Sequence, residues 1–183
     1  MKTAIFLTSG FEEIEALTVV DILRRAKISC DMISVDDDME VTGAHGIEVK
    51  ADSLISQIDF EEYECMILPG GSPGWQNLEK SQYLMKRLEE FIQKGKLVCA
   101  ICGAPTILGR KGYLNDKTAV CYPSLEAELK GAYVPDEEVV RDGNIITSRG
   151  VGTAIAFSAE IIRAILDDET AEEILKAIVY KQY

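Results

Sequence analysis

Short apolar runs alternate with amphipathic stretches along the chain. The runs have no regular polar side, which is typical of strands buried on both faces of a parallel sheet. We predict strands at Thr3–Leu7, Ser29–Val35, Glu64–Leu68, Lys96–Ile101 and Asn144–Ser148.

Several intervening stretches carry apolar residues at helical spacing. One set stands at positions i, i+4, i+7 and i+8, which form one face of a helix. It comprises Leu84, Leu88, Phe91 and Ile92. A similar set near the C-terminus comprises Ala171, Ile174, Leu175, Ile178 and Val179. We also predict a first helix over Gly10–Ala26, whose early acidic residues suit the positive end of a helix dipole.

Two segments break the alternation and are typical of hairpins. Glu40–Lys50 turns at residues 43–46, and Val139–Ser148 turns at residues 141–144. The pattern predicts one α/β domain over residues 1–183, a mostly parallel sheet with added hairpins and helices on both faces. Ligands of such folds bind beyond the carboxyl ends of the strands, so the loops that follow the strands matter most.

Composition narrows the class of protein. The chain is 47% hydrophobic, and no apolar run approaches the roughly 20 residues of a membrane span. Met1 leads directly into a strand without a signal sequence, so we expect a cytoplasmic protein. The net charge of −12 disfavours binding to nucleic acid or to an anionic membrane. Five cysteines, an odd number, argue against a disulfide framework.

The loop after the strand at Lys96–Ile101 carries the strongest chemical signal. Cys102 stands at a strand-to-helix turn, followed by Gly103 and Ala104, and Pro105 suits the first turn of a helix. Free N–H groups and the helix dipole at such a turn lower a thiol pKa and can hold an oxyanion. A buried, unreactive cysteine is the alternative.

Two further loops are predicted to meet this turn. Gly71, in the loop after Glu64–Leu68, can direct a backbone N–H to the same point as Gly103. In the loop after the first strand, Glu12 and Glu13 are predicted to be exposed acids at a helix start. Glu15 has apolar neighbours, so we expect it to point inward with a raised pKa and to hydrogen-bond the thiolate.

Three of the remaining cysteines and the single histidine suggest no redox or metal site. Cys30, Cys65 and Cys99 lie within predicted strands and are expected in the core. Cys99 and Cys102 would be about 10 Å apart at strand rise, beyond the roughly 7 Å limit for a disulfide. We expect His45, at a hairpin tip, to be a solvated turn residue.

Five motifs in this order resemble the DJ-1/ThiJ/PfpI superfamily, and in particular its small DJ-1-like branch. The resemblance covers essentially the whole chain. The motifs are residues 10–16, Asp21–Ala26, Leu68–Gly71, Ala100–Pro105 and Thr147–Thr153.

The resemblance implies a flavodoxin-like three-layer α/β/α sandwich that forms a homodimer and uses no metal or organic cofactor. It assigns the reactive cysteine to Cys102, its protonated carboxyl partner to Glu15, and the oxyanion donors to Gly71 and Gly103. It also implies stress-response functions: cysteine sulfinate formation, chaperone action, glyoxalase activity and removal of early glycation adducts.

The chain departs from some branches of the superfamily. Gly103 stands where the protease-like branch has histidine, which argues against a Cys-His-Glu hydrolase. Tyr122 takes the place of a second histidine, and tyrosine is a poor base near pH 7. Cys121 is either a core residue or a thiol that resolves oxidised Cys102. Arg25 is a candidate to reach the site of a partner subunit.

Two functions therefore stay open. In the first, Cys102 attacks a small carbonyl substrate while Glu15 carries the proton. In the second, peroxide oxidises Cys102 to the sulfinate and the protein acts as a redox sensor or chaperone. Both predict a low thiol pKa. Glutamine amidotransferase chemistry is disfavoured because its histidine is absent.

Overall fold

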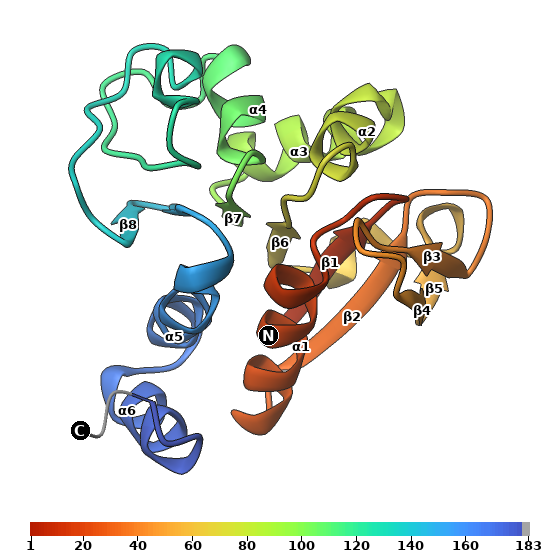
Figure 1. The fold of residues 1–183 in the computed structure, drawn as a ribbon, viewed down its shortest axis with the longest axis horizontal. Helices are drawn as coiled ribbons and strands as arrows, with labels where there is room; N and C mark the ends of the chain where they lie inside the picture. Colours follow the sequence, from red (N-terminus) through yellow and green to blue (C-terminus); the bar gives the residue numbers. More distant parts are fainter. Residues whose placement is uncertain (181–183) are drawn as a thin grey trace.

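The computed structural model of the chain describes residues 1–180 (Figure 1). Its central sheet has the strand order β5-β2-β1-β6-β7-β9-β8. Neighbouring strands run parallel except β8, which pairs antiparallel with β9. The sheet comprises β1 (Lys2–Leu7), β2 (Ser29–Ser34), β5 (Ser53–Leu54), β6 (Cys65–Leu68), β7 (Leu97–Ile101), β8 (Val139–Asp142) and β9 (Ile145–Ser148).

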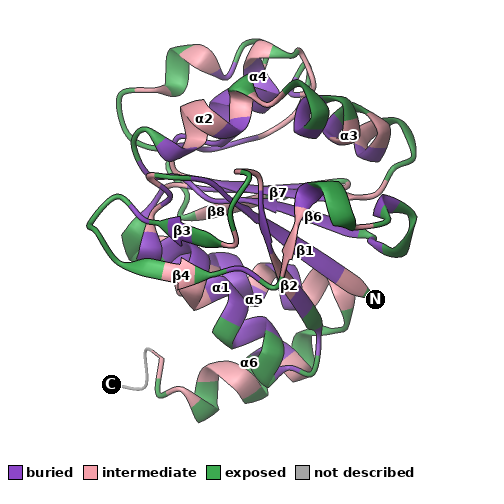
Figure 2. Ribbon diagram, turned by 90° about the vertical axis from the view of Figure 1, so that its right-hand side faces the viewer, coloured by how far each residue is buried: buried purple, intermediate pink, exposed green. Residues whose placement is uncertain are grey.

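Helices cover both faces of this sheet, as predicted. Figure 2 shows α2, α3 and α4 on one side and α1, α5 and α6 on the other. Their bounds are α1 (Glu13–Arg25), α2 (Gly74–Lys80), α3 (Gln82–Gln93), α4 (Pro105–Arg110), α5 (Ala154–Ile165) and α6 (Asp168–Ala177). None of these helices has the length and apolar character needed to cross a lipid bilayer. The flavodoxin-like three-layer fold is confirmed.

The strands are continuously apolar because their side chains pack into two hydrophobic cores, one on each face of the sheet. Ala4 and Phe6 of β1 pack into the cluster on one face of the sheet. Ile5 and Leu7 pack into the cluster on the other face. Successive side chains of a strand point to opposite faces, so a strand covered on both sides needs apolar residues at every position.

Both predicted hairpins are present. β3 (Glu40–Thr42) and β4 (Glu48–Lys50) form a separate antiparallel pair, in which Val41 lies opposite Val49. The β8–β9 pair extends the main sheet instead, with Val139 opposite Ser148.

The helix predictions need three corrections. The first helix begins at Glu13 rather than Gly10, because Gly10 has a φ of +87° that a helix cannot contain. The last helix ends at Ala177, and Val179 is an exposed residue with a φ of +60°. The α5 helix was not predicted, since packing against the sheet, α1 and α6 leaves it no continuous polar face.

The topology determines where the loops meet. The order β2-β1-β6-β7-β9 is that of doubly wound sheets, which bind ligands where the direction of winding reverses. Here β2 lies on one side of β1 and β6 lies on the other, so the direction of winding reverses between β1 and β6. The loops that follow these two strands therefore lead to opposite faces of the sheet. β7 pairs with β6 in parallel, which places the loop after Ile101 beside them.

Candidate active site

Cys102 lies at a sharp turn between β7 and α4. Its φ is +66°, a left-handed conformation that is uncommon for a residue with a side chain. Hydrogen bonds hold this backbone on both sides: its N–H donates to the Ser148 carbonyl at 2.9 Å, and its carbonyl accepts from the Tyr122 N–H at 2.8 Å. Strained backbone of this kind is characteristic of functional sites. The predicted strand-to-helix turn is confirmed.

Glu15 reaches the same point from the first turn of α1. Its side chain is fully buried, as predicted. The Gly70 N–H donates to its Oε2 at 2.8 Å, whereas its Oε1 is buried without a hydrogen-bond partner. Burial raises the pKa of Glu15 to about 7, although the Gly70 N–H opposes the rise. The direction of this shift agrees with the sequence prediction.

Gly70 is a site residue that the sequence analysis did not single out. A Cβ on Gly70 would lie 2.5 Å from the Cys102 Cβ, 2.6 Å from the Glu15 Oε2 and 2.9 Å from the Cys102 Sγ. All three distances are far below van der Waals contact. The thiol and the carboxyl can therefore meet only because this residue has no side chain. Its position next to Gly71, directly after a strand, was the available signal.

The N–H groups of Gly71 and Gly103 both lie at the sulfur, where they act against the rise in its pKa. Gly71 has a φ of +89°, and a side chain there would collide with the backbone of Gly10 and Glu12. A Cβ on Gly103 would lie 2.5 Å from the Trp75 ring nitrogen. The structure thus brings these two predicted donors together with Cys102 and Glu15.

The predicted low thiol pKa is wrong. Burial is the largest cause, and together with the charge of Glu15 it raises the pKa of Cys102 to about 12. The N–H groups of Gly71 and Gly103 do not offset this. α4 has only six residues and provides little helix dipole. Cys102 is consequently a thiol at neutral pH, and its activation requires a base.

His45 is a solvated turn residue, as predicted, but the predictions for Glu12 and Glu13 need correction, since the Glu12 side chain is only 12% exposed. Glu13 is buried rather than exposed, and its carboxylate accepts hydrogen bonds from the His45 N–H at 2.7 Å and from the Ile47 N–H at 3.4 Å. The ring Nδ1 of His45 lies 2.9 Å from Glu13 and 3.5 Å from Glu12. Gly43 leaves room for the carboxylate. His45 is solvated but paired, and Glu13 anchors the β3–β4 hairpin to α1.

Replacing Glu13 with Ala should destabilise the protein by about 1–3 kcal/mol, because partly buried N–H donors of the hairpin would lose a charged acceptor. Urea unfolding at pH 7 measures this loss. Glu12→Ala is the matched control, since the Glu12 side chain makes no cap hydrogen bond to α1. An equal loss in both variants would contradict the anchoring role of Glu13.

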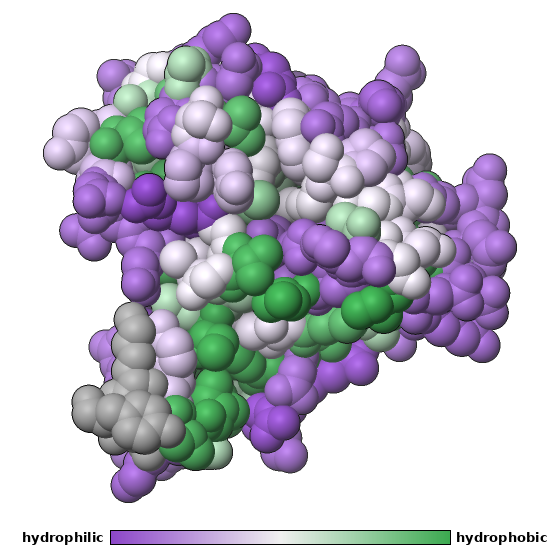
Figure 3. All heavy atoms as spheres, in the orientation of Figure 1, coloured by the Kyte–Doolittle hydropathy of each residue, from purple (hydrophilic) through white to green (hydrophobic). Residues whose placement is uncertain are grey.

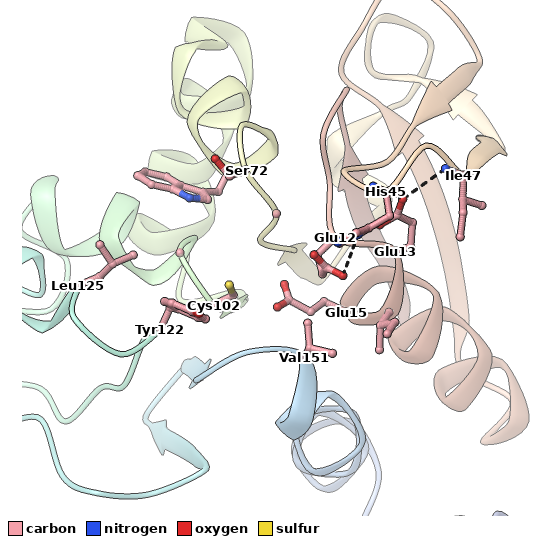
Figure 4. Close-up of a pocket in the computed structure, with 14 residues that line it drawn as sticks. Glu12, Glu13, Glu15, His45, Ile47, Ser72, Cys102, Tyr122, Leu125 and Val151 are labelled. Atoms are coloured by element: carbon pink, nitrogen blue, oxygen red, sulfur yellow. Dashed lines mark hydrogen bonds and ion pairs between the residues drawn. The ribbon is translucent and has the colours of Figure 1, made fainter.

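A cavity of about 670 Å³ opens above Cys102. In Figure 4, Tyr122 and Leu125 lie on one side of Cys102, and Glu12, Glu13 and His45 lie on the other. Tyr122 lines this cavity and is half-exposed. Within residues 1–180, one group has donor spacing suited to a metal ion: Glu12, Glu13 and His45, whose donor atoms lie within 4.8 Å of one another. A metal there would have to displace hairpin contacts of Glu13.

The two accessory candidates lie elsewhere in this chain. Cys121 is buried in the core cluster on the face opposite that of Cys102, and it lines a separate, smaller cavity. Its burial supports the first of the two alternatives, in which Cys121 is a core residue. Arg25 is on the surface of α1, where it pairs with Asp21 at 2.6 Å. Its predicted contact with a partner subunit stays a prediction. The cysteines expected in the core, Cys30, Cys65 and Cys99, are all buried.

Known proteins are similar to this chain in sequence and in fold. The model of the DJ-1/PfpI family matches residues 1–164. The chain belongs to the DJ-1/PfpI family. Protein dj-1beta of Drosophila melanogaster is 32% identical over 177 residues, which cover 96% of this chain and 95% of that protein. A Bacillus subtilis DJ-1/PfpI relative, named putative cysteine protease YraA, is 35% identical over 87% of this chain and 95% of its own.

Solved DJ-1 structures have the same fold. The structure of oxidised Toxoplasma gondii DJ-1 superposes with a TM-score of 0.94 at 34% identity, covering 98% of both chains. Drosophila melanogaster DJ-1beta superposes with a TM-score of 0.91. This chain is therefore a DJ-1-like member of the DJ-1/PfpI family, as its motifs indicated.

Proposed function

We propose that this chain is a reactive-cysteine stress-response enzyme that acts, without a cofactor, on glyoxals or early glycation adducts. The observation that carries the proposal is the buried Glu15 carboxyl beside a thiol that two backbone N–H groups face. A carboxyl with a pKa of about 7 is a competent general base near neutral pH. The cavity above the thiol gives a carbonyl compound access to it.

In this mechanism the thiolate is made only as it reacts. The Cys102 sulfur forms a bond to the aldehyde carbon of methylglyoxal while Glu15 takes the thiol proton. The carbonyl oxygen becomes an oxyanion that accepts hydrogen bonds from the N–H groups of Gly71 and Gly103. Glu15 then protonates this oxygen, which yields a hemithioacetal.

The remaining steps need only proton transfer and water. Glu15 removes the hydrogen on the former aldehyde carbon as a proton and returns it to the neighbouring ketone carbon, and the hydroxyl proton of the hemithioacetal moves to the former ketone oxygen. The aldehyde carbon is thereby oxidised to a thioester, and the ketone carbon is reduced to an alcohol. Water hydrolyses the thioester to lactate and restores the Cys102 thiol. The net reaction is addition of one water to methylglyoxal.

Lactate formation from methylglyoxal tests this proposal, and we expect Cys102→Ser to abolish it. The kcat/KM of the wild-type protein should rise about tenfold between pH 6 and pH 8, because the base form of Glu15 becomes populated around pH 7. A profile that is flat or falls over this range would contradict a base role for Glu15.

The second candidate function is redox sensing by Cys102. One observation favours it: the Glu15 Oε1 is buried without a partner beside the thiol, so a protonated carboxyl could donate to a sulfinate oxygen. Each of two peroxide molecules would transfer one oxygen to sulfur and leave as water. Sulfinate at Cys102 after low peroxide, together with no lactate formation, would favour this function. A core-buried Cys121 would not resolve the intermediate.

A homodimer and a cytoplasmic location stay predictions. Figure 3 shows hydrophobic side chains gathered over α1, α5 and α6 on the face that carries the cavity. Ile14, Ile47 and Val151, which line the cavity, are exposed large apolar residues. Their exposure supports an apolar interface beside the site.

A further inference from the structure

Most of the charged side chains that line the cavity are acidic. Three are carboxyl groups, Glu12, Glu13 and Glu15, and the fourth is the imidazole of His45. No lysine or arginine of the described chain lines this cavity. Glu13 is already bonded to the hairpin, and Glu15 lies against Cys102. Glu12 is therefore the carboxylate that is left to meet a ligand.

Glu12 is held in the wall rather than in solvent. Its side chain is only 12% exposed, and it begins α1 without a cap hydrogen bond to that helix. Its charged neighbour is the His45 ring at 3.5 Å, beyond ordinary hydrogen-bond length. A partly desolvated carboxylate with so weak a partner favours a positively charged ligand.

A second observation points to a ligand with hydrogen-bond donors. The Glu15 Oε1 is buried and has no partner, although Glu15 also lines the cavity. Buried acceptors are nearly always satisfied, so this oxygen is one that a bound molecule would complete. The cavity thus presents two carboxyl groups with unused capacity to the same space.

The opposite wall suits the apolar part of an organic ligand, which a bare ion lacks. Trp75, Tyr122 and Leu125 line it, and Figure 4 shows Tyr122 and Leu125 across Cys102 from Glu12. A cavity of about 670 Å³ also has the size of sites for ligands much larger than a three-carbon aldehyde.

We propose that Glu12 is a specificity residue that selects carbonyl substrates carrying an alkylammonium or guanidinium group and disfavours anionic ones. This inference rests on the proposed function and names the substrate class of the same site. The cation lies toward Glu12, the apolar part of the substrate packs on Trp75 and Tyr122, and the carbonyl lies over Cys102.

Binding without chemistry tests the inference. The Cys102→Ser protein is titrated with three probes of similar size: benzylammonium, benzyl alcohol and phenylacetate. Trp75 is the only tryptophan of the chain and lines the cavity, so its fluorescence reports binding. We expect the cation to bind at least tenfold tighter than the alcohol, and phenylacetate to bind most weakly.

Two variants in the same background assign the selectivity. Glu12→Gln should bring the cation and the alcohol within about twofold of each other. Glu173→Gln removes the same charge from an exposed position on α6 and should keep the full preference. Equal affinities for the three probes, or a preference that survives Glu12→Gln, would overturn the inference. So would micromolar zinc chloride binding that displaces the cation, because Glu12 would then be a metal ligand.

Turnover separates this inference from the proposed function. The wild-type protein is assayed with phenylglyoxal and with its 4-trimethylammonio and 4-carboxy derivatives. We expect kcat/KM to be highest for the cation and lowest for the carboxylate. Turnover of all three at equal efficiency would overturn the inference alone. Selective binding to the Cys102→Ser protein without turnover of any glyoxal would overturn the proposed function alone.

Discussion

Glu15→Gln should lower kcat/KM for methylglyoxal at least hundredfold at pH 8 and, at the same pH, make the protein more stable. The loss of activity follows from removing the base beside the Cys102 thiol, since general acid–base catalysis contributes about 10²- to 10⁴-fold. Burial still raises the pKa of the thiol in the variant, and the thiol loses the carboxylate that accepts its proton.

The gain in stability follows from the raised pKa of Glu15. The folded protein holds this proton up to about pH 7, whereas the ordinary carboxyl loses it near 4.5. The stabilising contribution is fully present below pH 4.5 and is lost as the pH rises through 7. The difference corresponds to about 3 kcal/mol. Glutamine does not ionise, so the variant does not lose this stability as the pH rises.

Urea unfolding at two pH values measures this effect. At pH 8 the variant should be about 3 kcal/mol more stable than the wild-type protein, and at pH 4.5 the two should nearly coincide. Shared effects of acid on other groups cancel in this comparison. A variant that loses activity and stability together at pH 8 would indicate a purely structural role for Glu15.

Gly70→Ala should lower kcat/KM by a similar factor, although it removes no functional group. The new Cβ would lie within 3.0 Å of Cys102 and of the Glu15 carboxyl, so both must move. A displacement of about 1 Å costs roughly 10²-fold in rate. The backbone of Gly70 is not in the left-handed region, so the effect is steric. Overpacking should also reduce stability by about 1–3 kcal/mol.

Gly152→Ala is the matched control for this prediction. Gly152 is exposed, and a Cβ there would meet no atom within 4 Å. Steady-state kinetics with methylglyoxal and urea unfolding of both variants give the comparison. Full activity in Gly70→Ala would mean that the thiol and the carboxyl do not need their present contact.

The sheet was predictable because its strands are covered on both faces. Residues 4–7 of β1 alternate their side chains between two cores, so all four must be apolar, and that run is visible in the sequence. α3 was equally predictable, since one of its faces is buried and the other is exposed to solvent. α5 was not, because it is apolar overall and packing on several sides leaves it few polar residues to mark an exposed face.

For the site, the sequence by itself determined the residue types and their loops. Cys102 follows one strand, Gly71 follows another, and Glu15 lies among apolar neighbours, so convergence at one edge of the sheet could be inferred. It also determined the family, since five motifs occur in order along the chain. Both inferences depend only on local pattern and strand order.

Only the tertiary structure decided which acidic groups of that site are buried and in which direction their pKa values shift. Glu13 is buried because the β3–β4 hairpin, about 30 residues further along the chain, folds over it. The pKa of Cys102 rises rather than falls because burial and Glu15 outweigh two N–H groups and a six-residue helix. A pKa is the sum of desolvation and of contacts between distant segments, and these opposing contributions have no signature in a local pattern.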